Sequence, residues 1–148
     1  MENLNFANMI EIARFCKSLD SQPNLREVIN EIDSLSSDFE VDNVRFINSN
    51  DIDEIQAEEL TSDLYVLGCF NASFIAEELN WPIELVEAAQ NGNAFEALGK
   101  AIADNVDMVS FAQAYSSADG YGHHFNHYDG NEIEFDINGS TYYVFDNR

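Results

Sequence analysis

Hydrophobic residues near the start of the chain recur three or four positions apart, which is the spacing of one face of an α-helix. The first such stripe consists of Phe6, Met9, Ile10, Ala13 and Cys16. After Pro23, Asn24 and Glu27 have the spacing of a helix-capping pair. A second stripe follows, and it consists of Leu25, Val28, Ile29, Ile32 and Leu35. The pattern predicts a helical hairpin over residues 1–35.

The middle of the chain is predicted to form a helical body over residues 44–115, opened by a short strand. Residues 44–47 are a β-prone run and indicate that strand. Downstream, apolar stripes and capping residues predict helices over residues 51–60, 64–75, 82–92, 93–102 and 105–115. Pro82 suits the first turn of its helix, and Asn93 and Asn105 are candidate N-caps. The widest stripe covers residues 64–75, so we expect that helix at the centre of the core.

The end of the chain changes to a β-strand pattern. Asn138-Gly139 separates two alternating runs, and Asn-Gly in that position is the strongest short-range signal for a hairpin. Asp129-Gly130 could turn a preceding strand over residues 123–128 into the same sheet. We expect a three-stranded antiparallel meander over residues 123–145, extended by residues 44–47.

These elements predict an α+β fold, with a mainly helical body and a small C-terminal antiparallel sheet. The 148 residues are the length of one ordinary domain, and the hydrophobic content of 45% is enough for a core. The sequence shows no internal repeat, linker or low-complexity tract. We therefore expect a single domain over residues 1–148.

The charge of the chain is strongly unbalanced. Acidic residues number 28 and basic residues 6, which gives a net charge of −22. A surface that binds phosphates needs clustered Lys and Arg, so the composition argues against direct binding of nucleic acid and against docking on anionic membranes. Residues 46–148 hold 19 of the acids and only Lys100 and Arg148 as bases.

The amount of charge is comparable to that of a short DNA segment. Duplex DNA carries about one charge per 1.7 Å of axis, so 22 charges correspond to roughly 37 Å, or about 11 base pairs. A compact domain of this length is about 38 Å wide. The alternative interpretation is that acidity serves only solubility, although ordinary surfaces mix both signs.

The sequence favours a cytoplasmic location. Residues 1–19 are amphipathic and lack the basic and continuous apolar segments of a signal peptide. No stretch approaches the roughly 20 apolar residues of a membrane span. Cys16 and Cys69 each fall on the apolar face of a predicted helix, so we expect two buried free thiols.

The three histidines fall close together, next to Asp129. On a strand, His123 and His127 would share a face but lie about 13 Å apart, too far to bind one ion without another element. The sequence contains no motif of a nucleophilic, nucleotide-binding or zinc-dependent enzyme. We therefore expect a protein that is not an enzyme and has no metal or cofactor. The alternative is a small metal-dependent enzyme that uses His123, His124, His127 and Asp129.

Two segments of the chain resemble small acidic proteins encoded by phages and plasmids. The first covers residues 67–74, and the second covers residues 118–132 together with the final run 142–145. In size and charge these proteins are similar to anti-restriction DNA mimics and anti-CRISPR proteins. The resemblance extends over about residues 44–148 and implies an origin in a mobile element. It carries no functional residue with it.

The functional expectation is an anti-defence protein that binds a CRISPR effector complex or a restriction enzyme of the host. Ordered carboxylates would occupy the basic groove that normally receives DNA or RNA. The expected contact residues are Asp51, Asp53, Glu54, Glu58, Glu59, Asp63, Glu77, Glu78, Glu84, Glu87, Tyr121 and Tyr128. Tyr121, Tyr128 or Tyr142 would act as aromatic anchors that add specificity. The protein itself would bind neither nucleic acid nor membranes, and a homodimer is an option. A second alternative is a non-enzymatic phage accessory protein that binds some other protein.

Overall fold

The computed structural model describes residues 3–148 and divides into two compact units. The sheet unit is formed by Met1–Ile52 together with Asp119–Arg148, and the helical unit is formed by Asp53–Ala118. The α+β class expected from the sequence is confirmed. Along the chain, the helical unit is inserted between the two segments of the sheet unit.

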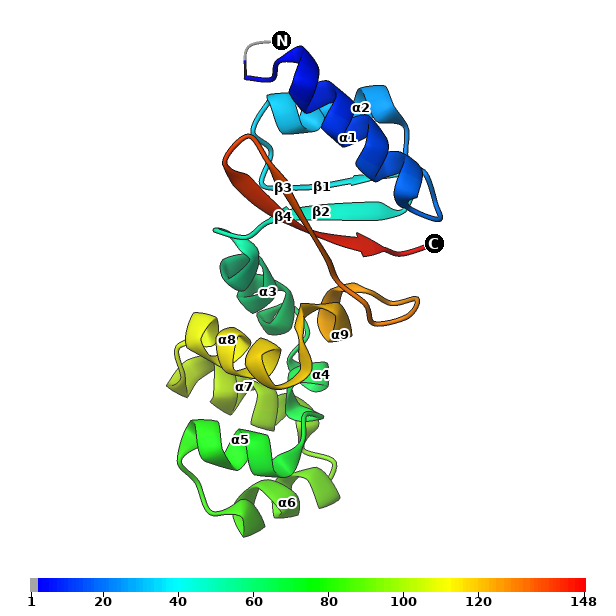
Figure 1. Cartoon of the computed structure of the whole chain (residues 1–148). Coiled ribbons are helices and arrows are strands. Elements are labelled where there is room, and N and C mark those ends of the chain that lie inside the picture. Colours follow the sequence, from blue (N-terminus) through cyan, green and yellow to red (C-terminus); the bar gives the residue numbers. More distant parts are fainter. Residues whose placement is uncertain (1–2) are drawn as a thin grey trace. The chain divides into compact units, whose positions relative to one another are not determined.

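The sheet unit contains a four-stranded antiparallel sheet with the strand order β1-β2-β4-β3 (Figure 1). Its elements are α1 (Phe6–Ser18), α2 (Leu25–Asp33), β1 (Asp38–Val41), β2 (Val44–Asn48), α9 (Tyr121–Phe125), β3 (Ile133–Ile137) and β4 (Ser140–Asp146). The predicted N-terminal helical hairpin, the strand at residues 44–47 and the hairpin at Asn138-Gly139 are confirmed. Asn138 and Gly139 both have positive φ, as a type I′ turn requires.

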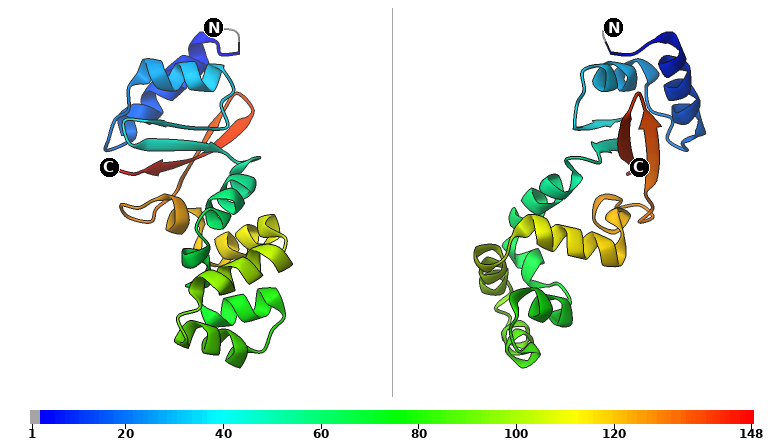
Figure 2. Two further views of the ribbon diagram at one scale, coloured as in Figure 1. Left: turned by 180° about the vertical axis from the view of Figure 1, so that it is seen from behind. Right: turned by 60° about the vertical axis from the view of Figure 1, so that its left-hand side comes forward.

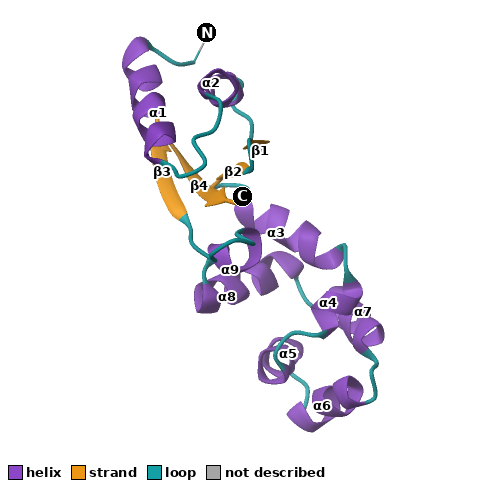
Figure 3. Ribbon diagram, turned by 90° about the vertical axis from the view of Figure 1, so that its right-hand side faces the viewer, coloured by secondary structure: helices purple, strands orange, loops and turns teal. Residues whose placement is uncertain are grey.

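One face of this sheet is covered by α1 and α2 (Figures 2 and 3). Alternate residues of the strands point to that face, and Phe46, Tyr142 and Val144 are buried there. The Phe15 ring of α1 stacks on Phe135 of β3 at a centroid distance of 4.2 Å. The predicted stripes are therefore buried only in part: Cys16, Val28, Ile29 and Ile32 lie in the core, whereas Phe6, Ile10, Leu25 and Leu35 are exposed.

The opposite face of the sheet packs against the short helix α9. The Phe125 ring lies 5.3 Å from the Phe145 ring, and the Arg45 guanidinium lies 5.1 Å from the centre of the same Phe125 ring. Tyr121 packs on Tyr143, with ring centroids 4.8 Å apart. The aromatic residues of this segment are thus part of the core of the sheet unit.

The predicted strand over residues 123–128 is wrong, because residues 121–125 form α9 instead. The Glu132 carboxylate accepts a hydrogen bond from the Tyr121 amide at 2.8 Å and caps the start of this helix. A Cβ at Gly122 would lie only 2.1 Å from the Gly130 carbonyl oxygen, so the chain folds back on itself at a position that only glycine permits. The expected meander is therefore a two-stranded hairpin, and β1 and β2 supply the rest of the sheet.

The helical unit runs from α3 to α8. Its helices are α3 (Ile52–Thr61), α4 (Leu64–Gly68), α5 (Ala72–Leu79), α6 (Ile83–Asn91), α7 (Phe95–Asn105) and α8 (Met108–Asp119). Their apolar faces meet in one core that contains Leu67, Ile75, Leu98, Ile102 and Phe111. The helices predicted from residue 51 onward are confirmed in type, with two differences in detail.

The single helix expected over residues 64–75 is wrong, because the segment is divided into α4 and α5. The Asn71 side chain accepts hydrogen bonds from the amides of Ser73 and Phe74, which caps the start of α5. The second difference concerns the starts of helices. Pro82 and Ala94 are the N-cap residues of α6 and α7, so Pro82 is not in the first turn and Asn93 is not a cap. At α8 the Asp107 side chain, and not Asn105, accepts bonds from the first amides. At α5 and α8, an Asn or Asp inside the apolar pattern therefore marks where the helix begins.

Helices α4 and α7 cross in direct backbone contact at two glycines. A Cβ at Gly68 would lie 1.8 Å from the Phe95 carbonyl oxygen, and a Cβ at Gly99 would lie 1.8 Å from the Leu64 carbonyl oxygen. Each glycine thus faces the first residue of the other helix, in an antiparallel arrangement. This crossing fixes the position of α4, which is only five residues long.

Candidate protein-interaction surface

The helical unit carries half of the net charge of the chain. Residues 53–118 contain twelve acidic residues and one basic residue, Lys100, and have a net charge of −11. The ammonium group of Lys100 lies 3.1 Å from the Asp104 carboxylate on the same helix. The single cation of this unit is therefore already paired, and the surface offers almost only negative charge.

The structure places the ten predicted acidic contact residues at the surface to different degrees. The exposed ones are Glu54, Glu58, Asp63, Glu77, Glu84 and Glu87, and the half-buried ones are Asp51, Asp53, Glu59 and Glu78. Asp51 belongs to the sheet unit, and the other nine belong to the helical unit. The exposed members are the residues that a partner protein could reach.

Three of the predicted acids hold local structure together. The Asp51 carboxylate accepts a hydrogen bond from the Ser37 hydroxyl at 2.7 Å, and Asp53 accepts one from the Gln113 amide at 3.2 Å. Asp63 caps α4 by accepting a bond from the Val66 amide. Their presence is explained by folding, so they are weaker evidence for binding than the exposed glutamates.

The exposed glutamates of the helical unit are not explained in this way. Within residues 3–148, Glu58, Glu77 and Glu87 form no side-chain hydrogen bond or ion pair. Glu54 and Glu58 lie four residues apart on α3, and Glu84 and Glu87 lie three apart on α6, which separates the members of each pair by about 5–6 Å. Like charges at this spacing cost a few tenths of a kcal/mol per pair.

The tyrosines proposed as anchors are mostly engaged within the chain. Tyr121 is half-buried against Tyr143, and Tyr128 is 56% exposed but has the Arg148 guanidinium 4.4 Å from its ring centre. Tyr142 is buried; its hydroxyl donates to the Ser36 carbonyl at 3.1 Å, and burial raises its pKa. These residues contribute to the sheet unit, and only the edge of Tyr128 is open to a partner.

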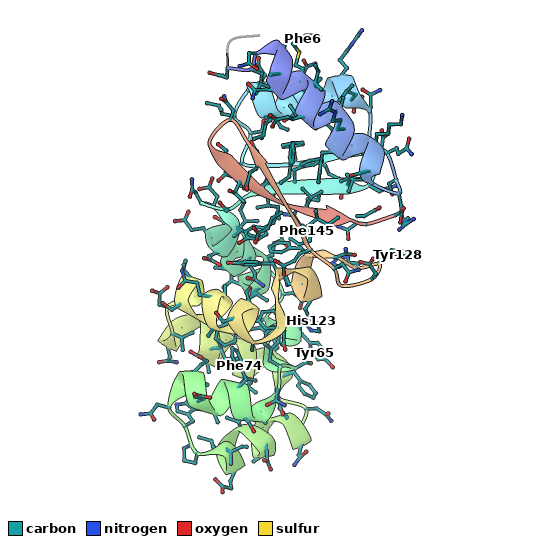
Figure 4. All side chains as sticks on the ribbon, viewed as in Figure 1. Phe6, Tyr65, Phe74, His123, Tyr128 and Phe145 are labelled. Carbon is teal, nitrogen blue, oxygen red and sulfur yellow. The ribbon has the colours of Figure 1, made fainter. Side chains whose placement is uncertain are left out.

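The exposed aromatic residue of the helical unit was missed by the sequence reasoning. Tyr65 on α4 is 54% exposed, and the neighbouring Val66 is 51% exposed (Figure 4). The Tyr65 ring rests on Phe95, with centroids 5.2 Å apart. Asp63 and Glu96, both exposed, are adjacent in sequence to this α4–α7 contact. The only sequence signal was a Tyr-Val pair inside an otherwise apolar helix.

The histidine segment does not assemble a metal site. Among residues 3–148, no three His, Cys, Asp or Glu side chains are placed to hold a metal ion together. The His127 amide donates to the Asn147 side chain, and the Asp129 carboxylate accepts from the amide of Asn131. The His124 ring packs edge-on against Phe125 at 4.6 Å. Turn hydrogen bonds and aromatic packing therefore account for the conformation of this segment.

The two cysteines differ from the expectation. Cys16 is a buried free thiol as predicted, and burial raises its pKa to about 11. Cys69 is exposed, so the prediction that it is buried is wrong. The reason is local: α4 ends at Gly68, and Cys69 stands at the C-cap position instead of on the apolar face of a continuous helix.

The structure and the comparisons add two findings. No helix among residues 3–148 has the length and apolar character needed to cross a bilayer. No family model matches the chain, and neither curated proteins nor solved structures give a significant match. The resemblance to acidic phage and plasmid proteins therefore stays a prediction.

Proposed function

We propose that the protein is an anti-defence inhibitor of mobile-element origin, acting in the cytoplasm of the host cell. Its partner is a basic nucleic-acid-binding complex, either a CRISPR effector or a restriction enzyme. Carboxylates of the helical unit occupy the groove that otherwise receives nucleic acid. The observation that carries the proposal is the net charge of −11 on a folded helical unit whose only cation is paired with Asp104.

The positions of the glutamates support a role beyond solubility. A carboxylate on a packed helix already has a fixed position. Its binding to Lys or Arg therefore avoids the conformational entropy cost of ordering a flexible tail. Such attraction speeds encounter and fades with salt. The like-charged pairs on α3 and α6 lower the stability of the free protein slightly. A basic partner would neutralise these charges, and relief of the repulsion would add to the binding free energy.

Tyr65 supplies the specificity that charge alone lacks. Exposed Tyr residues are common at the centres of interfaces, and a guanidinium can stack on the ring. The glycine crossing of α4 and α7 holds Tyr65 in place, so little conformational freedom is lost on binding. Tyr65 and Val66 supply an exposed apolar pair for the proposed contact, in addition to the exposed glutamates of the same unit.

The experiment measures cleavage of DNA by a panel of purified restriction enzymes and CRISPR effectors, at low and high salt. Wild-type protein should inhibit at least one member of the panel stoichiometrically. Inhibition should weaken steeply between about 50 and 200 mM salt. Absence of inhibition across the panel contradicts the proposal. So does retardation of duplex or single-stranded DNA by the protein alone in a gel-shift assay.

Charge reversal identifies the residues involved. Glu58, Glu77 and Glu87 lie on α3, α5 and α6, are exposed, and make no side-chain bond that holds the fold. Changing all three to Lys should weaken inhibition at least tenfold, while the thermal midpoint stays level or rises. The matched control changes Glu11, Glu40 and Glu134, exposed acids of the sheet unit, to Lys. Equal losses in both variants would mean that only the overall charge matters.

A further inference from the structure

Strand β3 forms one free edge of the sheet. The order β1-β2-β4-β3 gives β3 a single neighbouring strand, β4, and leaves its other side unpaired by any strand of residues 3–148. The segment Ile133–Ile137 alternates apolar and acidic residues, and its acids Glu134 and Asp136 are exposed. A free edge presents backbone donors and acceptors that can pair with a strand of another molecule.

The hairpin geometry determines which residues face the free edge. At the two-residue turn that closes the hairpin, Ile137 and Ser140 form the first hydrogen-bonded pair. Bonded and non-bonded pairs alternate along an antiparallel ladder, so Phe135 also bonds to β4, whereas Glu134 and Asp136 do not. The backbone N–H and C=O groups of these two acids therefore point away from β4. Within residues 3–148 they have no backbone hydrogen bond outside the ladder.

The residues with outward backbone groups are thus the same two that carry carboxylates. Their side chains lie on one face of the sheet, because they are two positions apart on a strand. Glu134 has no side-chain partner among residues 3–148, and Asp136 accepts a hydrogen bond from the Thr141 hydroxyl at 2.5 Å. The residues opposite them on β4 are Tyr143 and Thr141, so no cation within this ladder neutralises either acid.

A second copy of β3 cannot pair with this edge without placing acid against acid. In antiparallel pairing, residues with outward backbone groups lie opposite one another. When the two strands are centred on Phe135, Glu134 lies opposite Asp136 of the second copy. Centring them on Glu134 places this residue opposite its own copy, and Asp136 opposite Glu132. Like charges directly opposite each other destabilise a strand pair, and we propose that Glu134 and Asp136 keep the β3 edges of two copies from pairing.

The apolar residues of the segment explain why such protection is needed. Without its two charges, Ile133–Ile137 would be a short, β-prone, uncharged strand at an open edge, which is the pattern of segments that aggregate. Charged side chains on edge strands are a general means of preventing such pairing. These two acids therefore have a role separate from the inhibitory role proposed for the helical unit.

The other free edge repeats the arrangement in a weaker form. On β1, Asp38 and Glu40 are exposed and alternate with the buried Phe39 and Val41. Asp38 is neutralised by the Arg45 guanidinium at 2.7 Å. The β3 edge therefore depends more strongly on its charges, and it is the edge to test.

Sedimentation velocity of the full chain over about 5–500 µM measures the self-association that the proposal concerns. The variant Glu134→Gln, Asp136→Asn removes both charges, keeps the side-chain shapes and keeps an acceptor for the Thr141 hydroxyl. It should associate at least tenfold more tightly than wild type, and its infrared spectrum should gain the band of intermolecular strands. The matched control Glu11→Gln, Glu27→Gln removes as many charges from exposed positions of α1 and α2, and should stay within threefold of wild type.

A third variant separates strand pairing from other contacts. Glu134→Pro, Asp136→Asn removes the same charges and also the outward N–H of position 134, which β4 does not use. Proline is tolerated on an edge strand where the N–H faces solvent. Without that donor the edge cannot complete a ladder, so association should return to within threefold of wild type.

Three results would overturn the proposal. They are an uncharged β3 edge that associates no more tightly than wild type, equal association of the α1–α2 control, and equal association of the proline variant. Because Glu134 and Asp136 are exposed, circular dichroism of the Gln/Asn variant at low concentration should match that of wild type. The experiment contains no host protein, so its outcome is separate from that of the inhibition assay.

Discussion

Replacing Gly99 with Ala would test the crossing of α4 and α7, and with it the placement of Tyr65. The new Cβ would lie 1.8 Å from the Leu64 carbonyl oxygen, about 1.6 Å inside the shortest ordinary van der Waals distance. The obstacle is backbone, so no side-chain rotation relieves it. The two helices must move apart.

The cost follows from the packing that this separation removes. A gap of about 0.5–1 Å already forfeits a quarter to a half of the dispersion energy of a contact. The side chains beside the crossing are Leu67, Leu98 and Ile102, and each contributes about 1.5–3 kcal/mol when fully buried. Losing about half of that packing costs about 3 kcal/mol. Ala has a higher helix propensity than Gly by about 1 kcal/mol, so the net loss is about 2 kcal/mol.

Urea unfolding followed by tryptophan fluorescence would measure this loss. Trp81 is the only tryptophan of the chain and packs against the core of the helical unit, so its signal reports the unit that contains the crossing. The matched control is Gly92→Ala, where a Cβ would lie 3.3 Å from the Ala88 carbonyl oxygen and 3.8 Å from the Ala89 carbonyl oxygen. That variant should change the unfolding free energy by less than about 1 kcal/mol. A change below about 0.5 kcal/mol in Gly99→Ala would refute the reasoning.

Two further predictions concern the sheet unit. Gly139→Val should lower its unfolding free energy by about 1 kcal/mol or more, because Gly139 has φ +81° and a β-branched residue is strained there; Gly139→Asn should cost less, and hydrogen exchange of residues 133–146 would report both. Stability should also fall with alkaline pH. The pKa of Cys16 is about 11 in the fold against 9.0 for an ordinary thiol, so its contribution is complete below pH 9 and is lost as pH rises through 11. Burial raises the pKa of Tyr142 as well, which adds a loss in the same direction above pH 10. Denaturant unfolding at pH 8 and pH 10.5 should show a shallower loss for Cys16→Ala than for wild type, and equal losses would contradict the assignment.

Local patterns identified most elements because most residues of the apolar stripes are buried in the cores of the two units. The exceptions are places where a distant contact decides the conformation. His123 and Phe125 alternate as in a strand, but Glu132 caps a helix there and Gly122 packs against the Gly130 backbone. No periodicity in residues 121–128 encodes those contacts.

Strand β1 was missed for a different reason. Phe39 and Val41 alternate with Asp38 and Glu40, yet no strand was predicted over residues 38–41. The following Asp42 and Asn43 both have positive φ and form the tight turn into β2. The turn residues and the partner strand β2 both follow β1 directly, so the sequence contained the signals of a second β-hairpin over residues 38–48.

The candidate surface was also only partly predictable from the sequence. Its charge could be counted directly from the sequence, because acids on helix surfaces need no folding information to be identified. Exposure could not be counted: Tyr142 is buried, Tyr128 is next to Arg148, and Tyr65 is open. Which aromatic ring reaches the surface depends on how the helices and strands pack, and above all on the α4–α7 crossing.

The insertion of the helical unit between two parts of the sheet unit affects how the protein is made. Strand β2 pairs with β4 from Val44↔Asp146 to Asn48↔Tyr142, so its partner is synthesised about 100 residues later. Residues 53–118 are synthesised before β4, and this one continuous segment forms the whole helical unit. Until β4 is synthesised, the edge of β2 that pairs with β4 therefore has no partner strand. Such an edge can pair with another nascent chain.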